Sequence, residues 1–142
     1  MAAVRTFYLI RQVSNLVRTV LERGLAEFDV TPAQYTLMNW LVDRDAVTSA
    51  MLARALHVSP QTMNTLISAL HKRGLVSRES DAKNKRIVLI ALTPKGRETM
   101  QACSRTVDEL EDDYFAQLGA TELVGFRHTL EGLLTRRARR AA

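Results

Sequence analysis

Residues 59–92, SPQTMNTLISALHKRGLVSRESDAKNKRIVLIAL, contain the clearest structural signals in the chain. Ser59 predicts the start of a helix, because a serine side chain accepts a hydrogen bond from a free amide of the first turn. Pro60 favours the same start, since proline suits the first helical position. Gly74 predicts that this helix ends near Arg73.

Two apolar segments follow this helix and predict a β-hairpin. Residues 75–78 form a short strand candidate, and residues 86–92 form a second one that is rich in β-branched side chains. The residues between them, 79–85, are polar and charged, so we expect a hairpin with a basic tip.

A shorter helix is predicted just before this region. Thr48 or Ser49 can cap a helix over residues 50–56, and only His57 and Val58 separate it from the next helix. Two helices with a tight joint, followed at once by a basic hairpin, are typical of a winged helix-turn-helix.

The helix over residues 59–73 has two chemically different faces. A turn of 100° per residue places Met63, Leu66, Ile67 and Leu70 on one side. The opposite side carries hydrogen-bonding groups without carboxylates, which suit base edges and phosphates in a major groove. Its residues are Gln61, Thr65, Ser68 and Lys72, flanked by Thr62 and Asn64. The free backbone amides at the helix start near Ser59 are suited to binding a phosphate of the DNA backbone.

Four further helices are predicted, which makes the fold mainly α with one small β-hairpin. Apolar residues spaced by three or four predict an amphipathic helix over residues 5–24. A threonine cap followed by proline predicts helix starts at Thr31 and Thr93, and Gln34 completes a capping box in the first case. The last helix begins near Thr121.

The helix after Pro94 has an apolar seam suited to packing against a partner helix. The seam comprises Met100, Cys103, Val107, Leu110 and Tyr114. Cys103 occupies a seam position, so we favour a small buried hydrophobe there over the alternative, a redox sensor.

Charge is concentrated in one part of the chain. The chain of 142 residues has a formal net charge of +5. Residues 61–97 hold most of the excess positive charge, and residues 98–135 are acidic. The basic residues of the first segment are Lys72, Arg73, Arg78, Lys83, Lys85, Arg86, Lys95 and Arg97, against Glu79 and Asp81. This asymmetry favours a surface that faces a polyanion.

Several functional classes find no support in the sequence. The longest apolar run, residues 87–92, is far shorter than the roughly 20 residues that span a bilayer. The histidines, His57, His71 and His128, are far apart and match no catalytic or metal-binding spacing. We therefore expect no enzyme activity, no cofactor and no metal, and the single cysteine favours the cytoplasm.

The motifs together resemble the multiple-antibiotic-resistance regulator (MarR) family of winged helix-turn-helix transcriptional regulators. The resemblance is specific over residues 52–97, and the helix order extends it to the whole chain. It rests on Leu52-Ala53, Val58-Ser59-Pro60-Gln61-Thr62-Met63, Leu66, Leu70, Lys72-Arg73-Gly74-Leu75-Val76, Arg78, Asp81-Ala82-Lys83-Asn84-Lys85-Arg86 and Leu92-Thr93-Pro94-Lys95-Gly96.

The resemblance implies a homodimeric bacterial repressor that binds double-stranded DNA at a palindromic operator. It implies one unit over residues 1–142, with a DNA-binding region at 31–97 and dimerisation helices at 1–24 and 95–138. The helix after Ser59 would enter the major groove and the hairpin wing the minor groove. The expected DNA contacts are Ser59, Gln61, Thr62, Asn64, Thr65, Ser68, Lys72, Arg78, Lys83, Asn84, Lys85 and Arg86.

Three positions depart from the family pattern. The family's wing commonly reads Asp-x-Arg-x-x-Arg, whereas Lys83 stands here between Asp81 and Arg86. Lysine lacks the planar guanidinium of arginine, which predicts a weaker minor-groove contact. We expect Asp81 to orient a wing arginine. Thr65 and Ala69 stand where the family often has basic residues, which shifts the expected base contacts toward Gln61, Asn64 and the wing.

The resemblance also implies a small effector, such as an aromatic acid, that releases DNA. Candidate lining residues are Tyr8, Arg11, Asn15, Trp40 and His57. Two alternatives remain open at this point: a dimeric protein-interaction module that does not bind DNA, and a winged helix that binds RNA.

Overall fold

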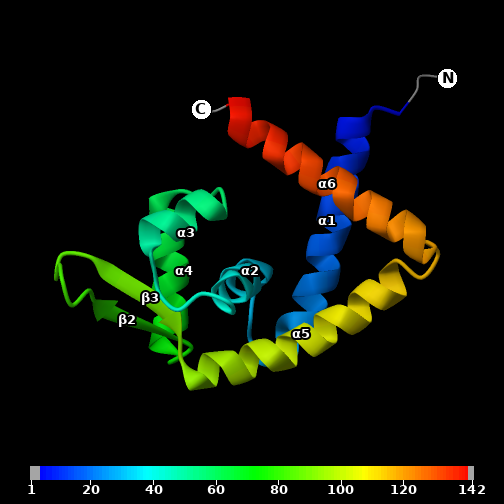
Figure 1. Ribbon diagram of the computed structural model, residues 1–142. Coiled ribbons are helices and arrows are strands. Elements are labelled where there is room, and N and C mark those ends of the chain that lie inside the picture. Colours follow the sequence, from blue (N-terminus) through cyan, green and yellow to red (C-terminus); the bar gives the residue numbers. More distant parts are fainter. Residues whose placement is uncertain (1–3, 141–142) are drawn as a thin grey trace. The chain divides into compact units, whose positions relative to one another are not determined.

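A computed structural model describes the backbone of residues 4–140 and the side chains of residues 4–136. The chain divides into two compact units, Met1–Val107 and Asp108–Ala142, and each is described by itself. The elements, shown in Figure 1, are α1 (Thr6–Leu25), the 3-10 helix η1 (Ala26–Phe28), α2 (Pro32–Leu41), β1 (Val47–Thr48), α3 (Ser49–Ala55), α4 (Pro60–Lys72), β2 (Val76–Ser80), β3 (Val88–Leu92), α5 (Pro94–Tyr114) and α6 (Ala120–Arg140). The predicted fold class, mainly helical with a small hairpin, is confirmed.

The helix starts follow from capping side chains. The Ser59 hydroxyl accepts a hydrogen bond from the Thr62 amide at 3.1 Å, so α4 begins where the Ser-Pro pair predicts. Thr31 and Gln34 form the complete capping box at the start of α2. Thr48, one of the two predicted candidates, caps α3 by accepting from the Met51 amide at 3.2 Å.

The end of α4 requires a glycine. Gly74 has a φ of +70°, in the left-handed region that side chains with a Cβ rarely adopt. The backbone leaves the helix there, and β2 begins two residues later at Val76.

The sheet is three-stranded and antiparallel, in the order β1-β3-β2. Strands β2 and β3 form the predicted hairpin, with Val76 opposite Leu92 and Ser80 opposite Val88. The short strand β1 pairs with β3 and was not predicted, because two residues are too few to show a periodicity. The wing thus extends from a sheet that is anchored at the start of α3 (Figure 1).

The core of the first unit takes apolar residues from every helix between α2 and α5. Met63, Ile67 and Leu70 of α4 are fully buried, as the helical periodicity predicts. Met100, Cys103 and Val107 of α5 belong to the same core. The prediction that these three residues form a seam against a partner helix is therefore wrong, because they pack within their own chain.

The second unit is held together by contacts near the connection between α5 and α6. The Phe115 ring packs edge-on against Tyr114 at a centroid distance of 5.1 Å, and it lies 6.2 Å from the Phe126 ring. Arg127 pairs with Glu111 at 3.1 Å. Beyond these contacts, α6 carries apolar side chains that its own unit leaves exposed, including Leu130, Leu133 and Leu134.

No helix within the described residues has the length and apolar character needed to cross a membrane.

Candidate nucleic-acid interface

The outward side of α4 forms an open, polar hollow. It is lined by Gln61, Asn64, Thr65, Ser68, Ala69 and Lys72. The structure therefore brings five of the predicted DNA contacts onto one surface, while the apolar side of the same helix is buried. The hollow contains no carboxylate, which suits the approach of a polyanion.

The hydroxyl groups at the start of α4 have intramolecular partners. The Ser59 and Thr62 hydroxyls lie 2.9 Å apart, and Thr62 also donates its amide to Ser59. The Thr65 hydroxyl donates to the carbonyl of Gln61 at 3.1 Å. By contrast, the side chains of Gln61, Ser68 and Lys72 form no hydrogen bond within the described residues, so their polar ends are available to a ligand.

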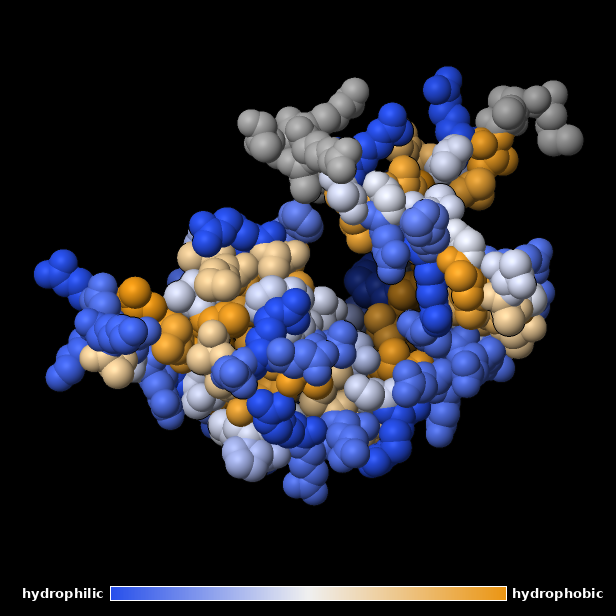
Figure 2. Space-filling view, viewed as in Figure 1, coloured by the Kyte–Doolittle hydropathy of each residue, from blue (hydrophilic) through white to orange (hydrophobic). Residues whose placement is uncertain are grey.

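The tip of the wing gathers exposed cations. Lys83, Lys85 and Arg86 lie in the turn between β2 and β3, and Arg78 lies on β2. Within residues 4–136, none of the four forms an ion pair. Figure 2 shows the tip as hydrophilic atoms at the left edge of the view. The positive charge of these four side chains is therefore not neutralised by a carboxylate within residues 4–136.

Asp81 organises the turn of the wing. Its carboxylate accepts hydrogen bonds from the backbone amides of Lys83, at 2.6 Å, and Asn84, at 3.2 Å. The side-chain oxygen of Asn84 accepts in turn from the Arg86 amide at 3.1 Å. The expectation that Asp81 orients a wing arginine is wrong, since it binds backbone amides instead.

Replacing Asp81 by alanine should lower DNA affinity several-fold, although the change removes a negative charge. A carboxylate that only repelled phosphate would give the opposite sign, because its removal would raise affinity. Asp81→Asn retains an oxygen acceptor and should bind at least as tightly as the wild-type protein. Fluorescence anisotropy with one duplex at fixed salt compares the three proteins, and tighter binding by Asp81→Ala would refute the organising role.

A second hollow lies beside the joint of the helix-turn-helix and includes a basic residue that was not predicted. Arg54, in the last turn of α3, lines it together with Ser49, Ala50, Ala53, His57, Val58, Pro60 and Asn64. His57 has a φ of 54°, so the joint turns through a left-handed residue. Arg54 could have been identified from the sequence as a candidate DNA contact, because it is a cation in the turn that precedes the Ser-Pro cap.

The five candidate effector residues lie on separate elements. Tyr8, Arg11 and Asn15 lie on α1, where the Arg11 guanidinium carbon is 5.7 Å from the centroid of the Tyr8 ring. Trp40 lies on α2, and Arg44 covers its ring at 3.7 Å. His57 lines the hollow beside the helix-turn-helix joint, and the other four candidates are not among the residues that line it.

Cys103 is a core residue. It is fully buried among apolar side chains. Desolvation raises the pKa of its thiol above the usual value, and this effect outweighs the opposing influence of a backbone hydrogen bond and of Arg73. Because the thiolate is the reactive form, the burial supports the interpretation as a small hydrophobe over that of a redox sensor.

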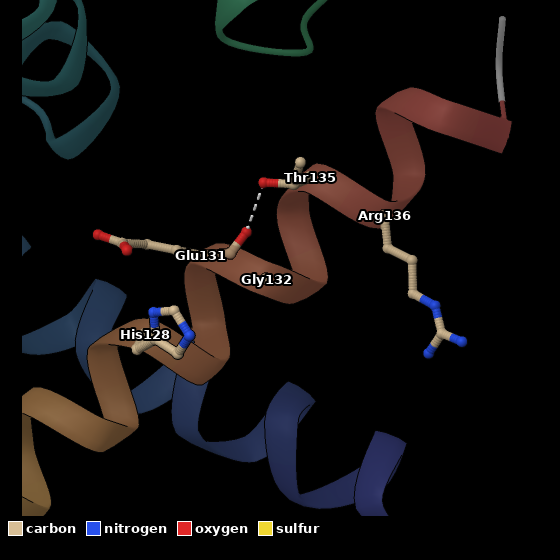
Figure 3. Close-up of a pocket in the computed structure, with 5 residues that line it drawn as sticks. All are labelled: His128, Glu131, Gly132, Thr135 and Arg136. Atoms are coloured by element: carbon tan, nitrogen blue, oxygen red, sulfur yellow. Dashed lines mark hydrogen bonds between the residues drawn. The ribbon is translucent and has the colours of Figure 1, made fainter.

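A third hollow lies on α6 and is drawn in Figure 3. It is lined by His128, Glu131, Gly132, Thr135 and Arg136, all from one helix. The Thr135 hydroxyl donates to the carbonyl of Glu131 at 2.9 Å, which is a bond within the helix. Among the described residues there is no group of three or more His, Cys, Asp or Glu side chains placed to hold a metal ion.

Comparison with known proteins gives consistent results. A family model described as MarR family matches residues 28–87. An HTH-type transcriptional repressor of Mycobacterium tuberculosis is 28% identical over 126 residues, which cover 89% of this chain and 91% of the relative.

Solved structures with a similar fold include two that hold DNA. The MepR–DNA complex of S. aureus superposes with a TM-score of 0.84 at 26% identity, covering 94% of this chain and 99% of that one. A mutant MarR from E. coli complexed with operator DNA gives a TM-score of 0.81 at 25% identity, covering 89% and 91% of the two chains. Together with the winged helix-turn-helix geometry, these matches show that the chain is similar in sequence and fold to transcriptional regulators of the MarR family.

Proposed function

We propose that the protein is a homodimeric repressor that reads a palindromic operator in double-stranded DNA. The observation that carries this proposal is the outward side of α4, where the side chains of Gln61, Ser68 and Lys72 form no hydrogen bond within the described residues and no carboxylate lines the hollow. In a major groove, such side chains contact base edges and phosphates. The wing next to α4 supplies cations that would contact an adjacent groove of the DNA or the DNA backbone.

The uncovered apolar side chains of α1 support the homodimer. Phe7 is 88% exposed and Leu16 is 56% exposed, so this helix leaves large apolar groups that its own unit does not cover. Burying such groups against a second copy would stabilise a dimer. In this proposal, residues 31–97 bind DNA, and residues 1–24 and 95–138 form the dimer.

The stoichiometry of the complex tests this arrangement. A dimer with two recognition helices requires two half-sites about one helical turn, 10–10.5 base pairs, apart. Sedimentation of the protein with a duplex carrying an inverted repeat should give two chains per duplex. Adding five base pairs between the half-sites should greatly weaken binding, and affinity that is independent of this spacing would exclude the dimer model. Duplex RNA should not compete for the protein, since its deep, narrow groove does not admit a helix. Competition by duplex RNA would support the RNA-binding alternative.

We also propose that a small aromatic acid weakens operator binding, with Tyr8, Arg11, Asn15, Trp40 and His57 as candidate contacts. Arg11 has an accessible guanidinium beside the Tyr8 ring, a pair suited to an aromatic carboxylate. A panel of aromatic carboxylic acids is first screened for the compound that lowers operator affinity most. That compound is then added to the Arg11→Ala variant, and its effect on operator affinity is measured. That variant should lose the response but keep the basal affinity, and an unchanged response would remove Arg11 from the site.

A further inference from the structure

The side chain of Arg73 connects the end of α4 to the segment that follows α1. Arg73 directly follows α4 as its C-cap residue and is half-buried. Its Nη2 donates a hydrogen bond to the Phe28 carbonyl at 3.0 Å, and its Nη1 donates to the Asp29 carbonyl. A guanidinium can only donate and a carbonyl can only accept, so both hydrogen bonds have one possible direction.

The two carbonyls lie where a helix ends. They belong to the end of η1, which continues directly from α1, and neither accepts a backbone amide within the described residues. Carbonyls at the end of a helix lack intrahelical partners and carry partial negative charge, which a cation stabilises. Asp29 has a φ of 53°, so the chain leaves the helix at the point where Arg73 binds. Arg73 therefore caps the end of α1 and η1 from a position 44 residues after Asp29.

The start of α5 also holds this end of α4. Lys95 Nζ donates to the carbonyl of Arg73 at 2.9 Å, and the Thr93 hydroxyl donates to the Gly74 carbonyl at 2.6 Å. Charge alone assigns Arg73 and Lys95 to a surface facing a polyanion, whereas both bind backbone carbonyls of their own chain. The adjacent Lys72 is exposed and lines the hollow on the outward side of α4. Lys72 rather than Arg73 is therefore placed as a DNA contact.

We propose that Arg73 is a positioning residue, which holds α4 against the end of α1 and so keeps the two recognition helices of the dimer at the separation of the half-sites. The inference rests on the proposed function, since the dimer through α1 and DNA reading by α4 both belong to it. Arg73 acts through the placement of α4 and does not itself contact DNA. Because α4 is a single helix of 13 residues, a shift at Arg73 also moves Gln61 near its other end.

The dependence of binding on half-site spacing tests this role. The probe is the inverted repeat that the wild-type protein selects from a random duplex library, compared with the same duplex carrying one extra base pair between the half-sites. The insertion shifts one half-site by about 3.4 Å and rotates it by about 35°.

We expect Arg73→Ala to bind the selected repeat about tenfold more weakly than the wild-type protein. The loss of affinity caused by the inserted base pair should become about fivefold smaller, because α4 is no longer held at one separation. The slope of log K against log[salt] should stay unchanged, since no phosphate contact is removed. Fluorescence anisotropy titrations with both duplexes at several salt concentrations measure these effects.

Two further variants serve as controls. Lys72→Ala removes the same charge from the adjacent residue, and it should make the salt slope shallower by about 1 while the effect of the insertion stays at the wild-type level. Arg73→Lys keeps the charge but offers one ammonium in place of the planar guanidinium. Its response to the insertion should lie between those of wild type and Arg73→Ala. It also keeps the test decisive if thermal unfolding shows that Arg73→Ala does not fold.

The outcomes separate positioning from its alternatives. If Arg73→Ala has a shallower salt slope and keeps the full effect of the insertion, Arg73 contacts phosphate. If affinity for both duplexes falls by the same factor at an unchanged slope, the substitution only reduces the amount of folded protein. Either result, or wild-type binding to both duplexes, refutes the inference while DNA recognition stands. If the wild type selects no repeat, or binds independently of spacing, the proposed function fails and the inference fails with it.

Discussion

Replacing Lys83, Lys85 and Arg86 together by alanine should lower DNA affinity about a hundredfold at physiological salt. The three cations lie in the exposed turn of the wing and have no carboxylate partner within the described residues. Each cation that neutralises a phosphate releases a counterion, so the plot of log K against log[salt] should become shallower by about 2 to 3. Fluorescence anisotropy titrations at several salt concentrations measure both effects.

A matched variant controls for the change in net charge. Arg18, Arg23 and Arg105 are also exposed but lie on α1 and α5, away from the wing, and Arg18 pairs with Glu22 at 3.4 Å. Replacing these three by alanine changes the net charge by the same amount and should leave the salt slope nearly unchanged. Equal losses in the two triple variants would mean that binding depends on overall charge and that the wing has no specific role.

Gly96→Ala should lower the free energy of unfolding by about 3 kcal/mol and the melting temperature by about 10 °C. Gly96 lies in the first turn of α5, where an added Cβ would be 1.9 Å from the backbone carbonyl oxygen of Leu75. That oxygen accepts a hydrogen bond from the Thr93 amide at 3.1 Å. Relieving the clash would therefore displace the start of α5 from the segment between α4 and the wing.

The same substitution at Gly125 provides the control. Gly125 lies inside α6, and a Cβ there meets nothing within 4 Å. Alanine at this position should leave stability unchanged or raise it by up to about 1 kcal/mol, because alanine favours the helix. Thermal and urea unfolding of both variants measure the difference, and a Gly96→Ala protein as stable as wild type would show that the close approach is not a constraint.

The local features of the fold were predictable because short-range chemistry determines them. The caps at Thr31 and Ser59 and the helix end at Gly74 depend on side chains within three residues of the boundary, and all three are confirmed. Strand β1 was missed because its two residues become a strand only by pairing with β3, about forty residues later in the chain. The second hairpin strand begins at Val88, two residues after the predicted start at Arg86, because hydrogen bonds of Asp81 and Asn84 extend the turn.

The candidate site was predictable as a surface but not as a set of contacts. The turn of 100° per residue was enough to place Gln61, Ser68 and Lys72 on one side of α4. The hydrogen bond between the side chains of Ser49 and Asn64, at 3.0 Å, joins α3 to α4 and has no signature in either helix. Apolar periodicity in α5 likewise does not distinguish a partner chain from the chain's own core, which explains why Met100, Cys103 and Val107 were assigned to a seam against a partner helix.

The most direct test of sequence-specific DNA binding is to select duplexes from a random library at about 0.15 M salt. Affinity is then measured for the winning sequence and for a scrambled version of it. We predict enrichment of an inverted repeat, bound about a thousandfold or more tightly than the scrambled duplex, because specific regulators discriminate to this degree. No enrichment, with equal and strongly salt-dependent binding to both duplexes, would mean that α4 and the wing attract DNA only by charge.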